Sequence, residues 1–454
     1  MTPQPQELLL AWYGDDYTGS AAVLEVLAFA GVKAMLFLEA PTQDQLARYS
    51  HLQAIGVAST ARAQSPDWMN RTLPSIFGSL LALQPGLFHY KICSTLDSSP
   101  TIGSIGCAIE IADHLLDPEA VPVMVAAPQM RRYQLFGHLF AGLGDEVYRL
   151  DRHPVMTRHP VTPMTESDVA RHISAQSKRI DTSLWSLEDM ATGCMPETAP
   201  ESDRISVLSV DCVDENNEAV IGQMLWNNRA QNPFVVGSQG VEYALVRHWS
   251  NTGTLPEQPV RGSAGRSTGM VSVSGSVSPT TAEQIDWSRA HGFQTIRFDV
   301  LQTVGDDNDL ENEISRVVAD SLLALSRGTD PLVYSAEGPD DPMVSQLTDA
   351  VVGAGLSLSV INEKIGVALG KVLYRVINQG NIRRAVVSGG DTSGYVTQQL
   401  GIFALSALAP TIAGASLSIV HADGAMDGLE LALKGGQMGS PDYFGWIRDG
   451  GGIR

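Results

Sequence analysis

Short apolar runs alternate with stretches of helical periodicity along the whole chain of 454 residues. Most of these runs are continuously apolar rather than alternating, which is typical of strands buried on both faces of a parallel sheet. The pattern therefore predicts an α/β protein in which strands and helices follow one another. The predicted strands span residues 8–13, 33–38, 53–58, 87–92, 121–126, 205–210 and 234–236 in the first half, and 270–273, 295–298, 331–334, 385–387 and 416–420 in the second.

One segment interrupts this pattern and predicts a domain boundary. Residues 251–268 lack periodicity and are rich in Gly, Pro and Ser, which is the composition of a linker. We therefore expect two unequal domains, residues 1–250 and 269–454, each with a mostly parallel or mixed sheet flanked by helices. Two such lobes joined by one linker favour an active site in the cleft between the lobes.

The charge of the chain limits its partners. Thirty Lys and Arg stand against fifty Asp and Glu, and the resulting net charge of -20 repels phosphate backbones and anionic lipid headgroups. Nucleic acid and membrane surfaces are therefore not expected as partners, and an anionic ligand must be held locally by helix N-termini, Lys or Arg. No apolar run reaches the roughly 18 residues of a membrane span, so we expect a soluble, cytoplasmic protein.

Two adjacent carboxylates follow the first predicted strand. Asp15 and Asp16 precede a helix predicted from about residue 21 to residue 30. Open α/β sheets bind ligands at the carboxyl ends of strands, where a carboxylate can take a proton from a substrate hydroxyl. Adjacent residues of an extended chain point apart, so one acid is expected to act in the chemistry while the other caps or orients. The structural alternative is that Asp16 or Thr18 only caps the helix.

Two cations follow later strands of the same predicted sheet. Arg62 comes after the third strand and Lys91 lies at the end of the fourth. The carboxyl ends of parallel strands share one edge of a sheet, so both cations are expected near Asp15 as a clamp for a carboxylate ligand. The alternative for either residue is an ordinary surface position.

Three turns of small residues follow strands in the second half. Glycines between a strand and a helix let backbone N–H groups approach a phosphate closely, and the helix N-terminus adds a favourable dipole. Three such turns predict a phosphate-binding nest, in which Asp391 could reach Mg²⁺ or water and Lys434 could neutralise a phosphoryl group. Any single turn of this kind is also an ordinary connection in α/β proteins. The turns are Ser274-Gly275-Ser276, Ser388-Gly389-Gly390-Asp391-Thr392-Ser393-Gly394 and Lys434-Gly435-Gly436-Gln437-Met438-Gly439.

Six motifs of the chain occur in the same order in a known family. They are Gly14 to Ser20, Lys91 to Leu96, Val236 to Gly240, Val273 to Pro279, Ser388 to Thr392 and Lys434 to Gly436. Together they resemble the four-carbon acid sugar kinase family, whose members phosphorylate threonate, erythronate, 3-oxo-tetronate and related acids with ATP. The resemblance spans almost the whole chain.

The resemblance implies an N-terminal lobe that binds the sugar acid and a C-terminal lobe that binds ATP with Mg²⁺. The base is then one of Asp15 and Asp16, with Asp16 favoured, and the sequence does not decide between them. We also expect a homodimer. The substrate site is predicted to contain Asp15, Asp16, Arg62, Lys91, Ser94 and Thr95. The nucleotide site is predicted to contain Ser274, Gly275, Ser276, Gly389, Gly390, Asp391, Thr392, Lys434, Gly435 and Gly436.

Two positions depart from the family pattern. The family usually reads Lys-x-Asp-Ser-Thr-Leu-Arg-Gly, whereas this chain has Cys93 in place of the acid and Asp97 in place of the arginine. Asp97 removes a cation and adds a hydrogen-bond acceptor, which predicts an oxo or branched acid, such as a 3-oxo-isoapionate-like acid, as substrate. The alternative is that Asp97 points to solvent and the substrate is an ordinary tetronate.

Two other functional classes fit the same acids and cations. One is a nucleotide-independent phosphatase or lyase acting on sugar-acid phosphates, and the other is a non-catalytic sugar-acid sensor. The small-residue turns of the second half favour the kinase over the phosphatase or lyase, because a reaction without a nucleotide does not need them.

Overall fold

The chain divides into two compact units, residues 1–259 and 260–454. The computed structural model describes residues 8–196, 203–255 and 262–454. The predicted linker 251–268 falls partly on residues 256–261, which lie outside the described residues, so its limits stay a prediction. Within the described ranges, no helix is long and apolar enough to cross a membrane.

The N-terminal unit is built on a parallel sheet with helices on both faces. Its strands lie in the order β2-β3-β1-β4-β11-β5-β10-β9, and neighbouring strands run parallel. Its elements are β1 (Leu10–Gly14), α1 (Tyr17–Phe29), β2 (Ala34–Phe37), α2 (Gln43–Arg48), β3 (Ala54–Ala58), α3 (Pro66–Leu81), β4 (Leu87–Lys91), α4 (Ile105–Leu116), β5 (Val121–Met124), α5 (Val169–Ser174), β9 (Ile180–Trp185), α6 (Leu187–Thr192), β10 (Ile205–Val210), α7 (Glu215–Asn227), β11 (Phe234–Gly237) and α8 (Gly240–Asn251).

The strand order and the handedness of the connections decide which helices share a face. The chain moves in one direction along the sheet from β1 to β2 and in the other from β3 to β4, so right-handed crossovers put α1 and α3 on opposite faces. Helices α1 and α7 both contact α8, and α3 contacts α4. The sheet is therefore covered on both sides, which explains why its strands are continuously apolar.

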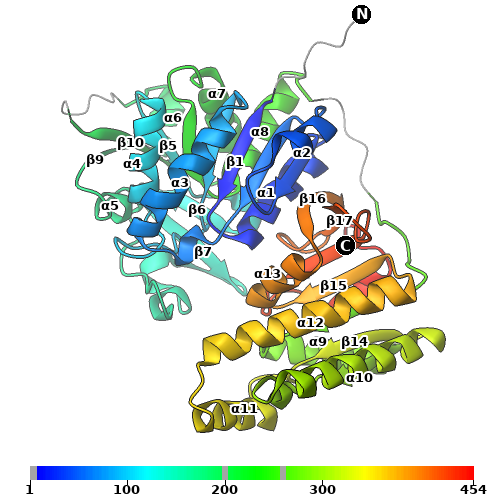
Figure 1. The fold of residues 1–454 in the computed structure, drawn as a ribbon. Helices are drawn as coiled ribbons and strands as arrows, with labels where there is room; N and C mark the ends of the chain where they lie inside the picture. The colour runs from blue at the N-terminus through cyan, green and yellow to red at the C-terminus, as the bar shows by residue number, and fades with distance from the viewer. Residues whose placement is uncertain (1–7, 197–202, 256–261) are drawn as a thin grey trace, which may run out of the picture. The chain divides into compact units, whose positions relative to one another are not determined.

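A small antiparallel sheet follows β5 in the N-terminal unit. It consists of β6 (Arg132–Leu135), β7 (His138–Leu143) and β8 (Glu146–Arg149), of which β6 and β7 are labelled in Figure 1. The Asp211 carboxylate anchors the turn between β6 and β7, because it accepts hydrogen bonds from the backbone N–H groups of Phe136 (2.7 Å) and Gly137 (2.8 Å). These strands were not predicted. They are short and only partly buried, with the patterns of half-exposed strands rather than of the continuously buried ones.

The C-terminal unit has a mixed sheet in the order β13-β14-β12-β15-β18-β17-β16. Strand β17 runs antiparallel to both β16 and β18, and the remaining neighbours are parallel. The elements are β12 (Val271–Ser274), α9 (Pro279–Ala290), β13 (Phe293–Arg297), α10 (Asp307–Ser326), β14 (Asp330–Tyr334), α11 (Pro342–Gly353), α12 (Leu358–Gly380), β15 (Arg384–Ser388), α13 (Gly390–Gln399), β16 (Ile402–Ala409), β17 (Leu417–Ala422), β18 (Glu430–Lys434) and α14 (Tyr443–Arg448).

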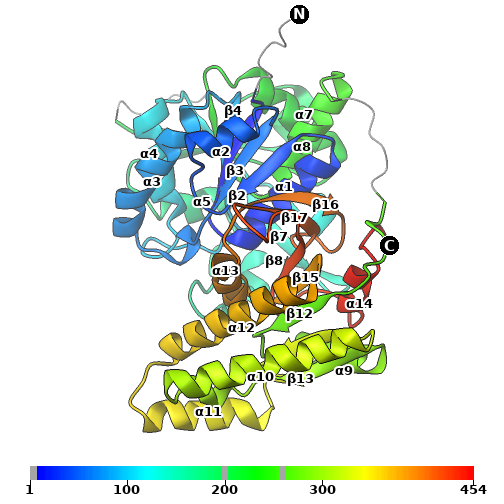
Figure 2. The same cartoon turned by 45° about the vertical axis from the view of Figure 1, so that its right-hand side comes forward.

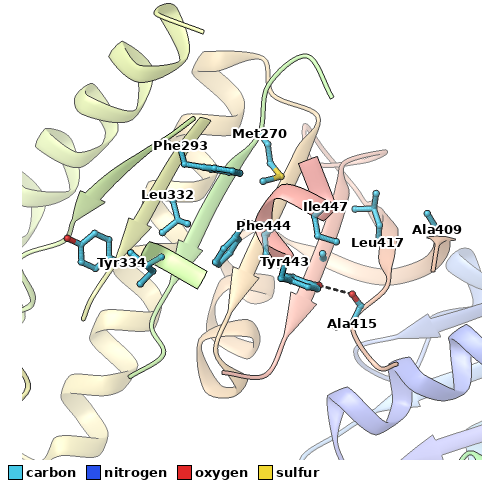
Figure 3. Packing of buried hydrophobic residues seen from close by; sticks show 13 residues of the cluster. Met270, Phe293, Leu332, Tyr334, Ala409, Ala415, Leu417, Tyr443, Phe444 and Ile447 are labelled. Carbon is cyan, nitrogen blue, oxygen red and sulfur yellow. Dashed lines mark hydrogen bonds between the residues drawn. The ribbon is translucent and has the colours of Figure 1, made fainter. Parts of the chain in front are cut away.

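Two helix layers cover this second sheet. Helices α10 and α12 lie side by side (Figure 1 and Figure 2). Helices α9 and α14 enclose a core with the strands, in which the rings of Tyr443 and Phe444 pack among aliphatic side chains (Figure 3). The buried Tyr443 hydroxyl donates a hydrogen bond to the carbonyl oxygen of Ala415 (2.9 Å), which satisfies its polar atom within that core.

The structure confirms the predicted α/β class, with mostly parallel sheets flanked by helices. Each predicted strand is present within a few residues of its predicted limits. Strands β9, β16 and β18 were missed. The sequence of β16, IFALSALA, is rich in Ala and Leu, which favour helices. The segment nevertheless forms a strand, so its local helix propensity pointed to the wrong structure.

A pair of glycine substitutions tests the packing of the first sheet. A Cβ atom on Gly56 in β3 would lie 1.9 Å from a ring atom of the fully buried Trp12, so Gly56→Ala should lower the free energy of unfolding by about 1–3 kcal/mol. Gly78 in α3 has no neighbour within 4 Å of such an atom, so Gly78→Ala should instead raise it by about 0.5–1 kcal/mol. Urea unfolding followed by circular dichroism measures both, and equal effects would contradict the packing argument.

Candidate functional site

Three neighbouring strands of the N-terminal unit end at the same level. Gly14 at the end of β1 is in register with Ala58 of β3 and Lys91 of β4. The loops that follow are joined by backbone hydrogen bonds, from the N–H of Asp15 to the carbonyl of Lys91 (2.9 Å) and from the N–H of Arg62 to the carbonyl of Asp15 (2.9 Å). The fold therefore brings together the acids and cations that the sequence predicted at one sheet edge.

A three-membered ion cluster lies at this edge. Nη2 of Arg62 donates hydrogen bonds to Oδ1 of Asp15 (2.7 Å) and to Oδ1 of Asp16 (2.8 Å), while Nε donates to Oδ2 of Asp15 (3.2 Å). The expectation that the two adjacent acids point apart is thus wrong, because both lie beyond the end of β1 and turn toward one guanidinium. Burial raises the pKa of the Asp15 carboxyl, and Arg62 opposes this effect. Burial alone would lower the pKa of Arg62, but Asp15 raises it well above its ordinary value, so the guanidinium stays charged.

Asp16 has a second role at the start of α1. Its Oδ1 accepts a hydrogen bond from the N–H of Gly19 (2.9 Å), so the predicted helix-capping role is present alongside the contact with Arg62. A Cβ atom on Gly19 would lie 2.4 Å from Asp16 Oδ1 and 2.7 Å from Lys91 Nζ. The absence of a side chain at Gly19 therefore lets the Lys91 ammonium approach this cluster. Lys91 is itself buried and donates to the carbonyl of Ile92 (2.6 Å).

The loop after β4 continues the site. Thr95 is buried, and its hydroxyl contacts the thiol of Cys93 (3.0 Å) and donates to the carboxylate of Asp97 (2.9 Å). Asp97 is half-buried, so it does not simply point to solvent. Burial raises the pKa of the Cys93 thiol to about 11, which keeps it neutral at physiological pH. Ser94 is half-buried in the same loop.

Sequence reasoning missed one cation near this loop. Arg132, the first residue of β6, lies within electrostatic range of both Cys93 and Asp97. A signal for it exists in the sequence, because Arg131 and Arg132 come after the buried strand β5, as Arg62 comes after β3. It went unused because β6 was not predicted.

The C-terminal unit repeats the arrangement of strands that end together. Ser388 at the end of β15 is in register with Ser274 of β12 and Lys434 of β18. The following turns are again joined, from the N–H of Gly275 to the carbonyl of Ser388 (3.1 Å) and from the N–H of Gly389 to the carbonyl of Lys434 (2.9 Å). The three predicted small-residue turns therefore form one surface.

The N-terminus of α13 is open at the centre of this surface. Its N-cap residue, Gly389, has φ of 127° and supplies no side chain to accept a hydrogen bond from the first turn. A Cβ atom at Gly389 would also lie 2.7 Å from the hydroxyl oxygen of Thr392, so the position requires glycine on both grounds. The first N–H groups of α13 are consequently available to an anion such as a phosphate.

A cavity of about 460 Å³ adjoins the start of α13. Seven of the ten residues predicted for the nucleotide site line it, and much of the rest of its lining is apolar. This combination fits a nucleotide, whose phosphates need N–H donors and whose base needs an apolar surface. The lining residues predicted from the sequence are Gly275, Ser276, Gly389, Gly390, Asp391, Thr392 and Gly436. The apolar wall, which the sequence did not reveal, contains Val300, Met343, Val344, Leu347, Leu358 and Ile365.

Three predicted residues of the nucleotide site do not line this cavity, namely Ser274, Lys434 and Gly435. The buried Lys434 ammonium donates to the carbonyl of Gly435 (3.2 Å) and lies 5.9 Å from the ring centre of Tyr443. Burial lowers the pKa of Lys434 to about 8. Within the described ranges, no cluster of three or more His, Cys, Asp or Glu side chains could hold a metal ion. The carboxylate that lines the cavity belongs to Asp391.

Comparison with known proteins defines the class. The model of a sugar-binding N-terminal domain matches residues 10–245, and that of a nucleotide-binding C-terminal domain matches residues 271–444. Together with the two sites, these matches define a two-domain kinase that binds a sugar through one unit and a nucleotide through the other. The chain belongs to the four-carbon acid sugar kinase family, which confirms the family predicted from the six motifs.

Relatives align with the chain from end to end. It is 42% identical to a 3-oxo-isoapionate kinase of Paraburkholderia graminis, over 99% of this chain and 96% of that protein. It is 28% identical to a 3-oxo-tetronate kinase of Cupriavidus necator, over 96% and 95% of the two chains. The crystal structure of Haemophilus influenzae protein HI1011 shares the fold, with a TM-score of 0.71 and 23% identity over 96% of this chain and 99% of that one.

Substitution of Gly390 tests the nucleotide site. A Cβ atom there meets no protein atom within 4 Å, so Gly390→Val should fold normally while its side chain enters the cavity. We expect ADP binding, measured by calorimetry, to weaken at least tenfold. Gly394 lies on the same helix, is equally free of neighbours and does not line the cavity, so Gly394→Val is the matched control. Equal ADP affinity in both variants would place the phosphates elsewhere.

Proposed function

We propose that this kinase transfers the γ-phosphoryl group of ATP to a hydroxyl of 3-oxo-isoapionate or a similar oxo or branched sugar acid. The observation that carries the proposal is the 42% identity to a 3-oxo-isoapionate kinase over nearly the full length of both chains. The half-buried Asp97, which accepts a hydrogen bond from Thr95, supports a substrate richer in hydroxyl groups than a plain tetronate. A 3-oxo-tetronate is the second candidate, since the Cupriavidus necator relative acts on that class.

Asp16 is proposed as the base that activates the acceptor hydroxyl. Asp15 is buried and paired with Arg62 through two hydrogen bonds, whereas Asp16 is about a quarter exposed and shares a single nitrogen of Arg62. As the hydroxyl oxygen bonds to the γ-phosphorus, the bond from phosphorus to the bridging oxygen breaks, ADP leaves and the hydroxyl proton passes to Asp16. In this proposal Asp15 holds the Arg62 guanidinium in place, and Lys91 lies beside the two acids. Ser94 and Thr95 are proposed to contact the sugar acid.

The nucleotide is proposed to lie with its phosphates at the N-terminus of α13 and its base against the apolar wall of the cavity. Mg²⁺ is usually held by one or two carboxylates together with phosphate oxygens, and Asp391 is the residue proposed to hold it here. When bound, the ion neutralises phosphate charge during transfer. Three residues predicted for this site do not line the cavity, and we propose that they stabilise the small-residue turns instead of contacting the nucleotide. They are Ser274, Lys434 and Gly435.

Phosphoryl transfer requires the γ-phosphate and the hydroxyl to meet with water excluded. An active site in a cleft between the two lobes, as expected from the sequence, stays a prediction. A homodimer and a cytoplasmic location also stay predictions.

The rival phosphatase, lyase and sensor do not use ATP, so thermal stabilisation by a nucleotide separates them from the kinase. A nucleotide at 100 times its dissociation constant raises the free energy of unfolding of the kinase by roughly 2.7 kcal/mol.

A screen of ADP release tests the function directly. The purified protein with ATP and Mg²⁺ is offered 3-oxo-isoapionate, 3-oxo-tetronates, D-threonate, L-threonate and D-erythronate. We expect the highest kcat/KM with an oxo or branched acid. Faster turnover of threonate or erythronate than of every oxo and branched acid would overturn the proposed substrate, and no ADP release with any acid would overturn the proposed function.

Replacement of Asp16 tests the base. Asn can still accept the hydrogen bond from the N–H of Gly19, so Asp16→Asn should keep the cap of α1 and the fold. Loss of general-base catalysis should lower kcat by about two to four orders of magnitude. Asp15→Asn should instead chiefly destabilise the protein, because it leaves Arg62 short of a buried partner. Near-normal turnover of Asp16→Asn would transfer the role of base to Asp15.

Replacement of Asp391 tests the metal site. We expect Asp391→Asn to raise the Mg²⁺ concentration needed for half-maximal activity at least tenfold, because one anionic ligand is lost. Titration of activity with Mg²⁺ at saturating ATP measures the effect. An unchanged Mg²⁺ dependence would show that Asp391 does not hold the ion.

A further inference from the structure

We propose that Arg132 is the residue that binds the carboxylate of the sugar acid, rather than the Arg62 and Lys91 clamp predicted from the sequence. This inference rests on the proposed function and assigns the orientation of the substrate in that site. It follows from a difference between the two guanidinium groups near Cys93, of which one is neutralised by the protein and the other is not.

The guanidinium of Arg62 is already matched by protein carboxylates. It binds Asp15 through two nitrogens and Asp16 through one of them, at 2.7 to 3.2 Å. Two acids beside one guanidinium leave a net negative cluster, to which the ammonium of the neighbouring Lys91 adds one positive charge. A substrate carboxylate placed there would face two anions at close range, which disfavours it as the binding point.

The guanidinium of Arg132 lacks such a partner. Its hydrogen bonds all come from Nη1 and go to backbone carbonyls of Met130 (3.1 Å), Arg131 (3.3 Å) and Gly142 (3.4 Å). Within the part of the chain that the structure describes, it forms no ion pair, and its buried Nε has no hydrogen-bond partner. A partly buried cation without a counter-ion is costly, and an incoming carboxylate removes that cost.

The neighbouring groups leave this charge unneutralised. Burial lowers the pKa of Arg132, whereas Cys93 and Asp97 act to raise it. Cys93 is a neutral thiol at physiological pH, because burial raises its pKa to about 11. Asp97 is engaged by Thr95 and makes no ion pair with Arg132 in the described ranges. Among the described residues Nε and Nη2 have no hydrogen-bond partner, and together they have the geometry that pairs with a carboxylate through two parallel hydrogen bonds.

The backbone holds Arg132 in a fixed place. Its N–H and carbonyl both pair with Ala127, just beyond β5, at 3.2 Å and 2.9 Å. Two residues further on, Gln134 pairs with Cys212 in the same way, and Asp211 anchors the turn after β6. A cation on so firmly attached a strand is suited to orienting a ligand. Cys93 is within electrostatic range of both Arg132 and Arg62. In the proposed orientation the substrate therefore crosses the loop of Cys93, with its carboxylate at Arg132 and its reacting hydroxyl at Asp16.

The test compares an acid with its uncharged counterpart. The best substrate from the ADP-release screen and its primary amide are assayed with the wild-type protein and with Arg132→Met, which keeps an unbranched apolar side chain but removes the guanidinium and its charge. We expect kcat/KM for the acid to fall at least about 100-fold while that for the amide changes less than threefold, so that the preference for the acid collapses. The KM for ATP should not change.

Matched variants separate this role from a structural one. Arg131 is the preceding residue and bonds the carbonyls of Gly144 and Glu146, so Arg131→Met should keep the preference for the acid. Arg132→Lys keeps the charge without the fork and should lose an intermediate part of the preference. Equal losses for acid and amide in Arg132→Met, or collapse of the preference in Lys91→Met instead, would overturn the proposal.

Calorimetry of acid binding without nucleotide keeps the two proposals distinguishable. Weaker binding of the acid to Arg132→Met than to Arg131→Met supports the inference even where turnover is low. Binding of the acid to the wild type without any ADP release would overturn the proposed function alone. Undiminished binding to Arg132→Met would overturn the inference and leave the kinase function standing.

Discussion

Both sites depend on one constraint, which is that three neighbouring parallel strands end in register. Gly14, Ala58 and Lys91 share one level in the first sheet, and Ser274, Ser388 and Lys434 share one level in the second. The next backbone N–H in each unit then reaches the neighbouring strand, as the bonds from Asp15 to Lys91 and from Gly389 to Lys434 do. Loops so joined cannot move independently, and residues far apart in the sequence are held at hydrogen-bonding distance.

The register of strand ends is the same in the two units, but the groups that it brings together differ. The N-terminal edge holds acidic and basic side chains, and the Arg62 guanidinium binds two neighbouring carboxyl groups. The C-terminal edge offers backbone N–H groups at an uncapped helix start, next to an apolar wall. A proton acceptor must have a titratable group, whereas a phosphate site works through amide donors that never lose their proton. The roles proposed for the two edges are consistent with acids in one loop and glycines in the other.

The strands and the residues that directly follow them could be predicted from the sequence. Features whose position depends on tertiary contacts could not. Continuous apolar runs located most strands, and the residues directly after them formed the acid cluster and the phosphate turns. Strand β16 was missed because Ala- and Leu-rich residues favour a helix until β17 pairs with them. The opposed orientation of Asp15 and Asp16 was wrong because strand alternation stops at Gly14. Arg132 and the apolar wall were not found, since their positions follow from a half-exposed hairpin and from helices packed far along the chain.

The net charge of -20 bears on the role proposed for Arg132, which forms no ion pair in the described ranges. A sugar acid and a nucleotide are both anions, so the long-range field of the protein opposes their approach. Salt screens that repulsion beyond about 8–10 Å, and affinity must then come from groups within direct reach. The Arg62 guanidinium already pairs with Asp15 and Asp16, so it attracts a further anion only weakly. A partly buried guanidinium that lacks a counter-ion gains the full interaction, and the cost of its burial thereby becomes selectivity for an acid over an uncharged sugar.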